Sequence, residues 1–269
     1  MMIKWLVIGT DQRLEMANDL LEEQGYESRY LAQDTFDENL KDILAEWQPK
    51  RIILPLLAMK QPIPAQLIRK DTVLYIGQSA QEWRADLDQS GVKYLNYLQN
   101  EQFIWQNAQL TAEAFVQVFY EQTKRQIAGK NFYIAGFGRV GKAVAHVLHS
   151  MQASVTITAR ADAQLAEANT LGYTSLRLTP STHFTDGYLV NTIPSQWLDV
   201  ANCSCQHIFD VSSAPGCLKP GRTSEYYTIH LKLPGIHFPA DAAAVLADAI
   251  LRMDTEERGA TCLKGKESD

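Results

Sequence analysis

The chain has 269 residues, enough for one or two domains with substantial buried cores, and we expect two. Hydrophobic residues make up 46% and charged residues 21%, which is typical of a globular protein and excludes a disordered, fibrous or disulfide-stapled chain. The formal net charge of −6 leaves no broad basic surface, so nucleic acid is not expected as a partner.

The apolar segments of the sequence are short. Runs such as Arg51–Ala58 have the length of a strand and fall well short of the roughly 20 residues that span a bilayer, so no membrane partner is expected. Met1–Gly9 lacks a cleavage pattern and predicts a first strand, not a signal peptide. The spacing of Cys203 and Cys205 is too tight for the usual zinc patterns. We therefore predict no metal site and a cytoplasmic protein.

Over the first hundred residues, β-rich runs alternate with helical stretches, as a parallel sheet with crossover helices requires. The predicted strands are Ile3–Ile8, Ser28–Leu31, Arg51–Leu56, Thr72–Ile76 and Val92–Leu95. Between the first two, Gln12–Gln24 has apolar residues at helical spacing, and Gly25 stands where a left-handed cap belongs. The pattern predicts a flavodoxin-like substrate domain over residues 1–106.

A second β/α series follows a long connecting helix, predicted over Asn107–Ala128 because that stretch contains neither Gly nor Pro. Its predicted strands are Asn131–Ala135, Ser154–Thr158, Tyr188–Asn191, His207–Val211 and Thr228–Leu231. The fold class is therefore α/β, with two doubly wound parallel-sheet domains, the second a Rossmann domain over 107–240. A last helix, Asp241–Met253, is expected to pack back on the first domain within 241–256, and Glu256–Asp269 is expected to fray.

The strongest chemical signal is Gly136-x-Gly138-x-x-Gly141, which follows the strand Asn131–Ala135 and opens a helical stretch. Gly136 allows the tight turn, Gly138 lets a pyrophosphate approach the backbone, and Gly141 lets helix and strand pack closely. The helix N-terminus presents unpaired N–H groups to the phosphates. The pattern predicts a dinucleotide-binding site.

The end of the next strand indicates which dinucleotide is bound. Where an acidic residue would accept hydrogen bonds from the ribose of NAD, the chain has Thr158-Ala159-Arg160. Arg160 can donate to a 2′-phosphate, which predicts NADP(H), and Arg139 in the glycine loop can assist. Two alternatives stay open: Arg160 is a solvated loop residue, or Asp162 is the ribose ligand.

In open α/β sheets ligands bind beyond the carboxyl ends of the strands. In the second domain these positions hold Asn191–Pro194 and Asp210–Gly216, turns with small polar side chains from which Asn191 and Ser213 are predicted to line the cofactor site. In the first domain they hold Asp11 and Arg13, where Arg13 can pair with a substrate carboxylate. A helix N-cap is the alternative for Asp11, and a solvated or acid-paired position for Arg13.

Further candidates lie near the expected boundary of the domains. Asn107, Thr111 and Glu113 fall at the start of the connecting helix and are predicted substrate-site residues. His230 lies in the last predicted strand and His237 follows it; both are expected in or beside the cleft and are candidates for acid–base catalysis. The sequence does not decide between the two histidines.

Several blocks together resemble the family of the dipicolinate synthase A subunit. They are Gly9-x-Asp11-x-Arg13, Asn107-Ala-x-x-Thr111-Ala-Glu113, the glycine loop with Arg139, Ala159-Arg160, Asn191-Thr-Ile-Pro194, Asp210-x-x-Ser213-x-Pro215-Gly216 and Leu233-Pro-Gly235-x-x-x-Pro239. The resemblance implies an NADP-linked enzyme that oxidises a dihydrodipicolinate-like intermediate to pyridine-2,6-dicarboxylate, a spore component. It also implies a partner, a flavoprotein-like B subunit, and we expect a homo-oligomer.

Carried over to matching positions, the resemblance makes Asp11, Arg13, Asn107, Thr111 and Glu113 substrate-site candidates. It makes Gly136, Gly138, Gly141, Arg160 and Asn191 cofactor contacts. The sequence departs from the family pattern at Ala114, at Cys217 and over Ala240–Ala243, so the resemblance does not specify the exact substrate.

Two other functions are compatible with these patterns. A D-2-hydroxyacid dehydrogenase shares the two-domain plan, but it needs an Arg–Glu–His set, and Arg222, Glu225 and His230 are too close together to reproduce the spacing. The second alternative is a non-catalytic protein that senses NADPH. Turnover of a substrate distinguishes both enzymes from the sensor.

Overall fold

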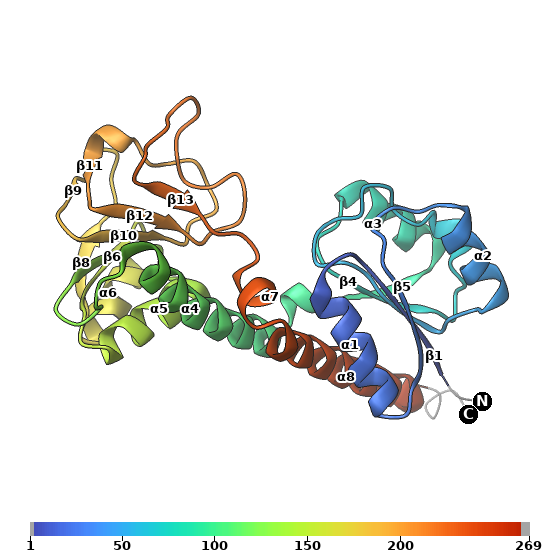
Figure 1. Cartoon of the computed structure of the whole chain (residues 1–269). Helices are drawn as coiled ribbons and strands as arrows, with labels where there is room; N and C mark the ends of the chain where they lie inside the picture. The colour runs from blue at the N-terminus through green and yellow to red at the C-terminus, as the bar shows by residue number, and fades with distance from the viewer. Residues whose placement is uncertain (1–2, 265–269) are drawn as a thin grey trace. The chain divides into compact units, whose positions relative to one another are not determined.

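The computed structural model describes residues 3–264 (Figure 1). Residue contacts divide this part of the chain into two compact units, one formed by 3–106 with 239–264 and the other by 107–238. Each unit contains a parallel sheet with helices alternating along the chain, which confirms the predicted α/β class. No helix in residues 3–264 is long and apolar enough to cross a membrane.

The sheet of the first unit has the order β2-β1-β3-β4-β5, and all neighbouring strands are parallel. This is the flavodoxin-like order. The strands are β1 (Lys4–Ile8), β2 (Glu27–Leu31), β3 (Arg51–Ile53), β4 (Val73–Ile76) and β5 (Lys93–Asn96). The helices are α1 (Gln12–Glu23), α2 (Glu38–Glu46), α3 (Gln81–Ser90) and α8 (Pro239–Lys264), with 3₁₀ turns η1 (Ala65–Leu67) and η2 (Tyr97–Gln99).

Both faces of this sheet are buried. Successive side chains of β1 point to opposite sides of the sheet, and each side is covered by helices. Trp5 and Val7 share a core with side chains of α1 and α8. Leu6 and Ile8 share a second core with side chains of α2 and α3. In Figure 1, α8 lies alongside α1, so the C-terminal helix completes the core of the N-terminal unit.

The main sheet of the second unit has the order β13-β12-β10-β6-β7-β8, again all parallel. If β6 is counted as the first strand of this sheet, the order is that of a Rossmann fold. The strand order reverses between β6 and β10, which is the topological switch point. The strands are β6 (Asn131–Ala135), β7 (Ser154–Ala159), β8 (Thr174–Arg177), β10 (Tyr188–Asn191), β12 (His207–Asp210) and β13 (Tyr227–Ile229). A two-stranded ladder pairs β9 (Phe184–Thr185) with β11 (Cys203–Ser204).

The helices of the second unit cover this sheet. They are α4 (Glu101–Thr123), which belongs to this unit from Asn107 onward, α5 (Arg139–Ser150), α6 (Asp162–Thr170), the short α7 (Leu233–His237) and a 3₁₀ turn η3 (Val200–Asn202). Phe115 and Phe119 of α4 contact Phe132 and Phe209 of the sheet, and these aromatic rings form the centre of the unit's main core.

Three strands of this unit escaped prediction. β8 is an edge strand whose side chains are mostly exposed, so it lacks the apolar run of a buried strand. β9 and β11 are two residues long each. In the first unit, β3 ends at Ile53 instead of the predicted Leu56, because Pro55 has no N–H group for the ladder.

Two helices differ from their predicted ranges. α4 begins at Glu101, earlier than Asn107, because Asn100 accepts a hydrogen bond from the backbone N–H of Phe103 at 2.9 Å and starts the helix there. α8 continues through Lys264, so the prediction that the chain frays from Glu256 was wrong for 256–264; the last predicted residues, 265–269, lie outside the described part.

Candidate functional site

The glycine loop lies between β6 and α5, as the sequence predicts. Gly136 has φ of 93°, and a Cβ atom built there would lie 2.6 Å from Thr192 Oγ1. A Cβ atom on Gly141 would lie 2.1 Å from the carbonyl oxygen of Gly136. Both positions therefore need glycine for the protein's own packing, because real Cβ atoms do not approach neighbours so closely.

Gly138 is different. Its φ is −83°, which any residue adopts, and a Cβ atom there would meet no other atom of the described chain within 4 Å. The space beside Gly138 is open at the N-terminus of α5, where the first backbone N–H groups of the helix lack intrahelical acceptors. A bound phosphate fits this cradle, since those N–H groups and the helix dipole favour an anion there.

Three charged residues lie near the ends of β7 and β8. Arg160 follows β7 directly and is exposed. Arg177, at the end of β8, donates from Nη1 to the backbone carbonyl of Arg160 at 3.0 Å and from Nη2 to the carboxylate of Asp162. Asp162, the alternative ribose ligand, is therefore paired with a cation. No hydrogen bond or ion pair of the Arg160 guanidinium is found among residues 3–264.

The ends of β10 and β12 are joined by a buried carboxylate, Asp210, which is 0% exposed. Its Oδ1 accepts from Asn191 Nδ2 at 2.9 Å and from the backbone N–H and hydroxyl of Ser212 at 3.0 and 2.7 Å. Its Oδ2 accepts from the backbone N–H of Cys217 at 2.6 Å and from the Tyr227 hydroxyl at 2.9 Å. Five donors thus hold one carboxylate.

The hydrogen bonds determine the charge of this group. Burial alone would raise the pKa of Asp210, but the hydrogen bonds from Ser212 and Asn191 outweigh it, and the pKa lies below its ordinary value. Burial, with the hydrogen bond to Asp210, raises the pKa of Tyr227 well above its ordinary value. Asp210 is therefore ionised at neutral pH, and Tyr227 stays a protonated donor.

This network fixes the loops that follow β10 and β12. Asn191 is fully buried, and its amide oxygen accepts from Trp197 Nε1 at 3.0 Å. Gly216 has φ of 88°, and a Cβ atom there would lie 2.4 Å from the Tyr227 hydroxyl. Ser213 lies between these points and is exposed. The structure thus leaves Ser213 accessible and places Asn191 inside the protein, where its side chain positions the surrounding loops.

Asp210 itself was not among the predicted site residues. The sequence placed it only as the first residue of the predicted turn Asp210–Gly216, without a role of its own, and in the structure it ends strand β12. Its partners lie on β10, on β13 and on its own loop, so only the pairing of the strands brings them together.

In the first unit, Asp11 and Arg13 meet. Asp11 caps α1, since its carboxylate accepts from the backbone N–H of Arg13 at 3.1 Å, which confirms the N-cap interpretation. The guanidinium of Arg13 also donates to both carboxylate oxygens of Asp11, from Nε at 2.9 Å and from Nη2 at 2.8 Å. Arg13 is 5% exposed and Asp11 is half-buried, so a part-buried bidentate ion pair lies at the carboxyl end of β1.

The three candidates on α4 have different surroundings. Thr111 is buried, and its hydroxyl donates to the carbonyl oxygen of Asn107 at 2.8 Å, one turn earlier in the helix. Glu113 is exposed, and its carboxylate accepts from Gln109 Nε2 at 3.0 Å. The side chains of Thr111 and Glu113 thus engage groups of their own helix.

Of the two candidate catalytic histidines, His230 shares a hydrogen-bonded cluster with His207, and His237 influences it electrostatically. The Nε2 atoms of His230 and His207 each lie 2.8 Å from the hydroxyl of Thr228 on β13. Burial lowers the pKa of His230, and a positive charge on His207 or on His237 lowers it further, so the three rings are electrostatic neighbours. His237 ends α7 and is half-buried.

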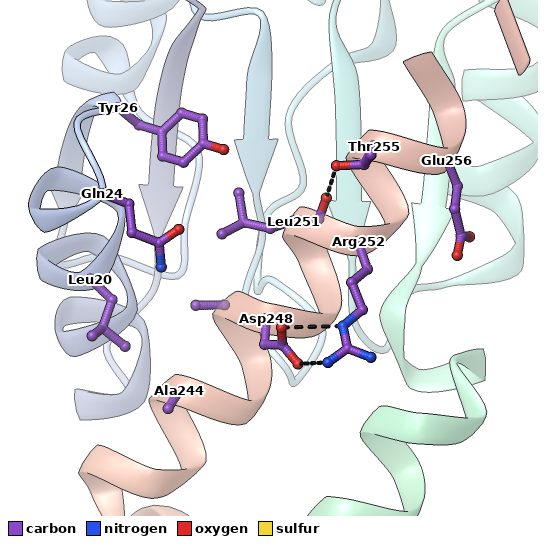
Figure 2. Close-up of a pocket in the computed structure, with 10 residues that line it drawn as sticks. Leu20, Gln24, Tyr26, Ala244, Asp248, Leu251, Arg252, Thr255 and Glu256 are labelled. Atoms are coloured by element: carbon purple, nitrogen blue, oxygen red, sulfur yellow. Dashed lines mark hydrogen bonds and ion pairs between the residues drawn. The ribbon is translucent and has the colours of Figure 1, made fainter. Parts of the chain in front are cut away.

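A groove of about 580 Å³ runs along α1 and α8 in the first unit (Figure 2). Figure 2 shows that Asp248 and Arg252 on its wall pair with each other, at 2.6 Å between Oδ2 and Nη2. Two of its three charged side chains are therefore paired with each other, the third being Glu256, and no sequence-predicted site residue lines it. No group of three or more metal-binding side chains occurs in the part of the chain that the structure describes.

Neither a comparison with protein-family models nor one with curated proteins returned a match. Solved structures do match. The dipicolinate synthase A chain from Bacillus subtilis has a TM-score of 0.78 at 20% sequence identity and covers 96% of this chain and 98% of its own. The dipicolinate synthase A subunit from Bacillus halodurans has a TM-score of 0.72 at 19% identity, covering 93% and 97%.

A third match is a D-isomer specific 2-hydroxyacid dehydrogenase from Lactobacillus delbrueckii ssp. bulgaricus, solved in its NAD complexed form. Its TM-score is 0.54 at 13% identity, over 95% of this chain and 97% of its own. Identities of 20% and below establish a shared fold. Along nearly its whole length, the chain has the fold of the two dipicolinate synthase structures.

Proposed function

We propose that the chain is an NADP-linked oxidoreductase that oxidises a dihydrodipicolinate-like compound to pyridine-2,6-dicarboxylate, as the names of its structural neighbours suggest. The observation that carries the proposal is the cradle at Gly138, with Arg160 at the end of β7 and Arg177 at the end of the neighbouring strand β8. The match to two dipicolinate synthase structures supports the substrate class.

The cofactor is proposed from the fit of the residues. The pyrophosphate would lie beside Gly138 against the first turn of α5, where Arg139 is also exposed. A 2′-phosphate would lie against Arg160, with Arg177 beside it. Asp162 is already paired with Arg177, so it does not offer a free carboxylate to the ribose of NAD. When bound, NADP⁺ supplies the hydride acceptor for the oxidation.

The proposed substrate-binding residues are Asp11, Arg13, Asn107, Thr111 and Glu113. Arg13 is central to this proposal, because a dicarboxylate that enters a protein of net charge −6 needs a fixed cation. Asp11 takes up Nε and one donor of Nη2, which leaves the other N–H groups of Arg13 for a substrate carboxylate. The ion pair with Asp11 then orients the guanidinium.

The oxidation removes a hydride and a proton from the dihydropyridine ring. A bound NADP⁺ would accept the hydride, and a base of this chain must accept the proton for the ring to become aromatic. We propose His230 or His237 as that base. The lowered pKa of His230 keeps its imidazole neutral at pH 7, as a proton acceptor must be. Asp210, through Asn191 and Tyr227, positions the loops around the cofactor.

The experiment is an assay of the purified chain with NADP⁺ and the dihydrodipicolinate-like compound, generated in situ. Formation of NADPH and pyridine-2,6-dicarboxylate in equal amounts supports the proposal. Oxidation of D-2-hydroxy acids instead would identify the alternative that the third structural neighbour favours. Binding of NADPH without turnover of any substrate would indicate the sensor protein. Absence of dinucleotide binding would overturn the proposed oxidation and both alternatives, the D-2-hydroxyacid dehydrogenase and the sensor.

The remaining parts of the proposal concern partners and location. We propose a cytoplasmic protein that works with a flavoprotein-like B subunit and forms homo-oligomers, since both dipicolinate synthase neighbours carry the letter A in their names, which implies a further component. Sedimentation of the purified chain, by itself and with the co-expressed candidate B subunit, measures both associations.

A further inference from the structure

The first unit contains a cavity of about 180 Å³ at the carboxyl ends of β3 and β4. Its wall is largely apolar and includes Leu54, Met59, Ile76 and Trp83. None of the predicted site residues lines it. The cavity lies where ligands bind in open α/β sheets, beyond the carboxyl ends of parallel strands.

Hydrogen bonds and close packing hold the wall in place. The backbone N–H of Gln78 donates to the carbonyl of Leu56 at 2.9 Å, which ties the loop after β4 to the loop after β3. A Cβ atom on Gly77 would lie 2.5 Å from the carbonyl oxygen of Pro55, so these loops are in contact. The indole of Trp83 donates to the carbonyl of Ile63 at 2.7 Å. The cavity is therefore preformed.

One polar atom in this wall has no protein partner. Ser79 lines the cavity, and its Oγ is buried without a hydrogen-bond partner among the described residues. A buried hydroxyl without a partner is costly, and such an atom in a cavity is satisfied by a ligand or by water. Lys60, at the same cavity, pairs with Asp34 at 3.2 Å between Nζ and Oδ2, so its charge is already matched.

We propose that this cavity binds a small molecule with a single aromatic ring and one hydrogen-bonding group, which pairs with Ser79 Oγ. An apolar cavity of about 150 Å³ accommodates benzene, and 180 Å³ leaves room for one small substituent. The apolar wall favours the ring, and Ser79 fixes its orientation. The inference does not depend on the proposed oxidation.

The test uses 4-fluorophenol and fluorobenzene, which differ by the hydroxyl group, and follows binding to the full chain by fluorine NMR without dinucleotide. Both probes are expected to bind saturably. Ser79→Ala should weaken 4-fluorophenol about threefold to tenfold, the effect of one neutral hydrogen bond, and leave fluorobenzene unchanged. Ser90→Ala, at the end of the following helix, is the matched control and should change neither.

A second variant tests whether the probes bind inside the cavity. Ser79→Leu fills the cavity and should abolish the binding of both probes, with folding checked by the thermal midpoint. The proposal is overturned by non-saturable binding, by equal affinities of 4-fluorophenol for the parent and Ser79→Ala, or by a crystal soaked with the probe that shows only water in the cavity.

A competition experiment then shows whether the ligand of the cavity is the proposed substrate or a separate effector. If pyridine-2,6-dicarboxylate displaces 4-fluorophenol, and Arg13→Ala weakens that displacement, the cavity holds the ring of the proposed substrate. If both bind together, the cavity takes a separate effector. Because the probes are measured without turnover, failure here leaves the oxidation assay unaffected, and failure of that assay leaves this result intact.

Discussion

The guanidinium of Arg13 and the carboxylate of Asp11 form a part-buried bidentate pair, with 2.9 Å from Nε to Oδ1 and 2.8 Å from Nη2 to Oδ2. The two residues are separated by one position, so the pair forms within the turn that caps α1. A cation held in this way is oriented at the carboxyl end of β1 before any ligand arrives, which lowers the entropy lost on binding.

We expect Arg13→Ala to weaken the binding of pyridine-2,6-dicarboxylate about tenfold to a hundredfold, because one charge-assisted contact contributes ~1.5–3 kcal/mol. NADPH affinity should not change. The measurement is calorimetric titration with each ligand. Arg29→Ala, which removes an exposed cation that stacks on Trp47 at 4.5 Å, is the control and should bind the diacid like the parent. Unchanged diacid affinity in Arg13→Ala would show that Arg13 serves only to pair with Asp11.

Gly138→Ala should affect cofactor affinity, whereas Gly141→Ala should affect stability. The first places a methyl group in open space, so the thermal midpoint should stay near that of the parent while NADPH affinity falls at least tenfold. The second places a Cβ atom 2.1 Å from the carbonyl of Gly136 and should lower the free energy of unfolding by about 1–3 kcal/mol. Differential scanning calorimetry and dinucleotide titration separate the two. Normal NADPH binding by Gly138→Ala would contradict the proposed cradle.

Arg160→Ala should remove most of the preference for NADPH over NADH, a change of roughly tenfold to a hundredfold in the ratio of dissociation constants. Arg177→Ala should act differently, because it also releases Asp162, whose free carboxylate can accept from the ribose of NADH. We expect NADH affinity to rise in that variant. Arg252→Ala in the first unit is the control. Equal affinities for the two dinucleotides in the parent protein would exclude this role of Arg160.

The glycine loop was predictable because its signal is local: a strand, three glycines and a helix follow one another within eleven positions of the printed sequence, Asn131–Gly141. The strands β6 and β10 were predicted at their observed bounds for the same reason, since both are continuous β-rich runs. Arg177 was missed because β8 is an exposed edge strand that carries no apolar pattern.

The buried carboxylate network could not be predicted in this way. Asn191, Asp210 and Tyr227 stand far apart in sequence, and only the pairing of β10, β12 and β13 brings their side chains within hydrogen-bond distance. The buried hydroxyl of Ser79 could not be predicted either, because its lack of a hydrogen-bond partner depends on how two loops and α3 pack around it. Local patterns do not encode such contacts.

Asp210 should make the free energy of unfolding depend on pH in the acidic range. Its folded pKa lies below the ordinary value of 3.8, so the unfolded chain binds the proton more readily. The stabilisation is therefore complete above that ordinary value and is lost as the pH falls through the lower folded pKa. Tyr227→Phe removes one donor to the carboxylate and should cost about 1.5–3 kcal/mol at neutral pH and less in acid. Urea unfolding at several pH values measures this; a cost that does not depend on pH would contradict it.

The last prediction concerns the base. Burial, and then the neighbouring His207 and His237, lower the pKa of His230 below its ordinary value of 6.5, while Asp210 acts in the opposite direction. If His230 accepts the proton, kcat/KM should rise with pH along a limb whose midpoint lies below pH 6.5, because only the neutral imidazole is active.

His230→Gln should lower kcat by about a hundredfold to ten-thousandfold, the usual contribution of a general base, and remove this acidic limb from the pH profile. NADPH affinity should stay unchanged. His237→Gln is the paired variant, since the ring of His237 also lowers the pKa of His230. If His230 is the base, His237→Gln keeps most of the activity and moves the limb to higher pH, because one cationic neighbour is gone. Loss of the limb in His237→Gln, with the limb retained in His230→Gln, would assign the proton transfer to His237 instead.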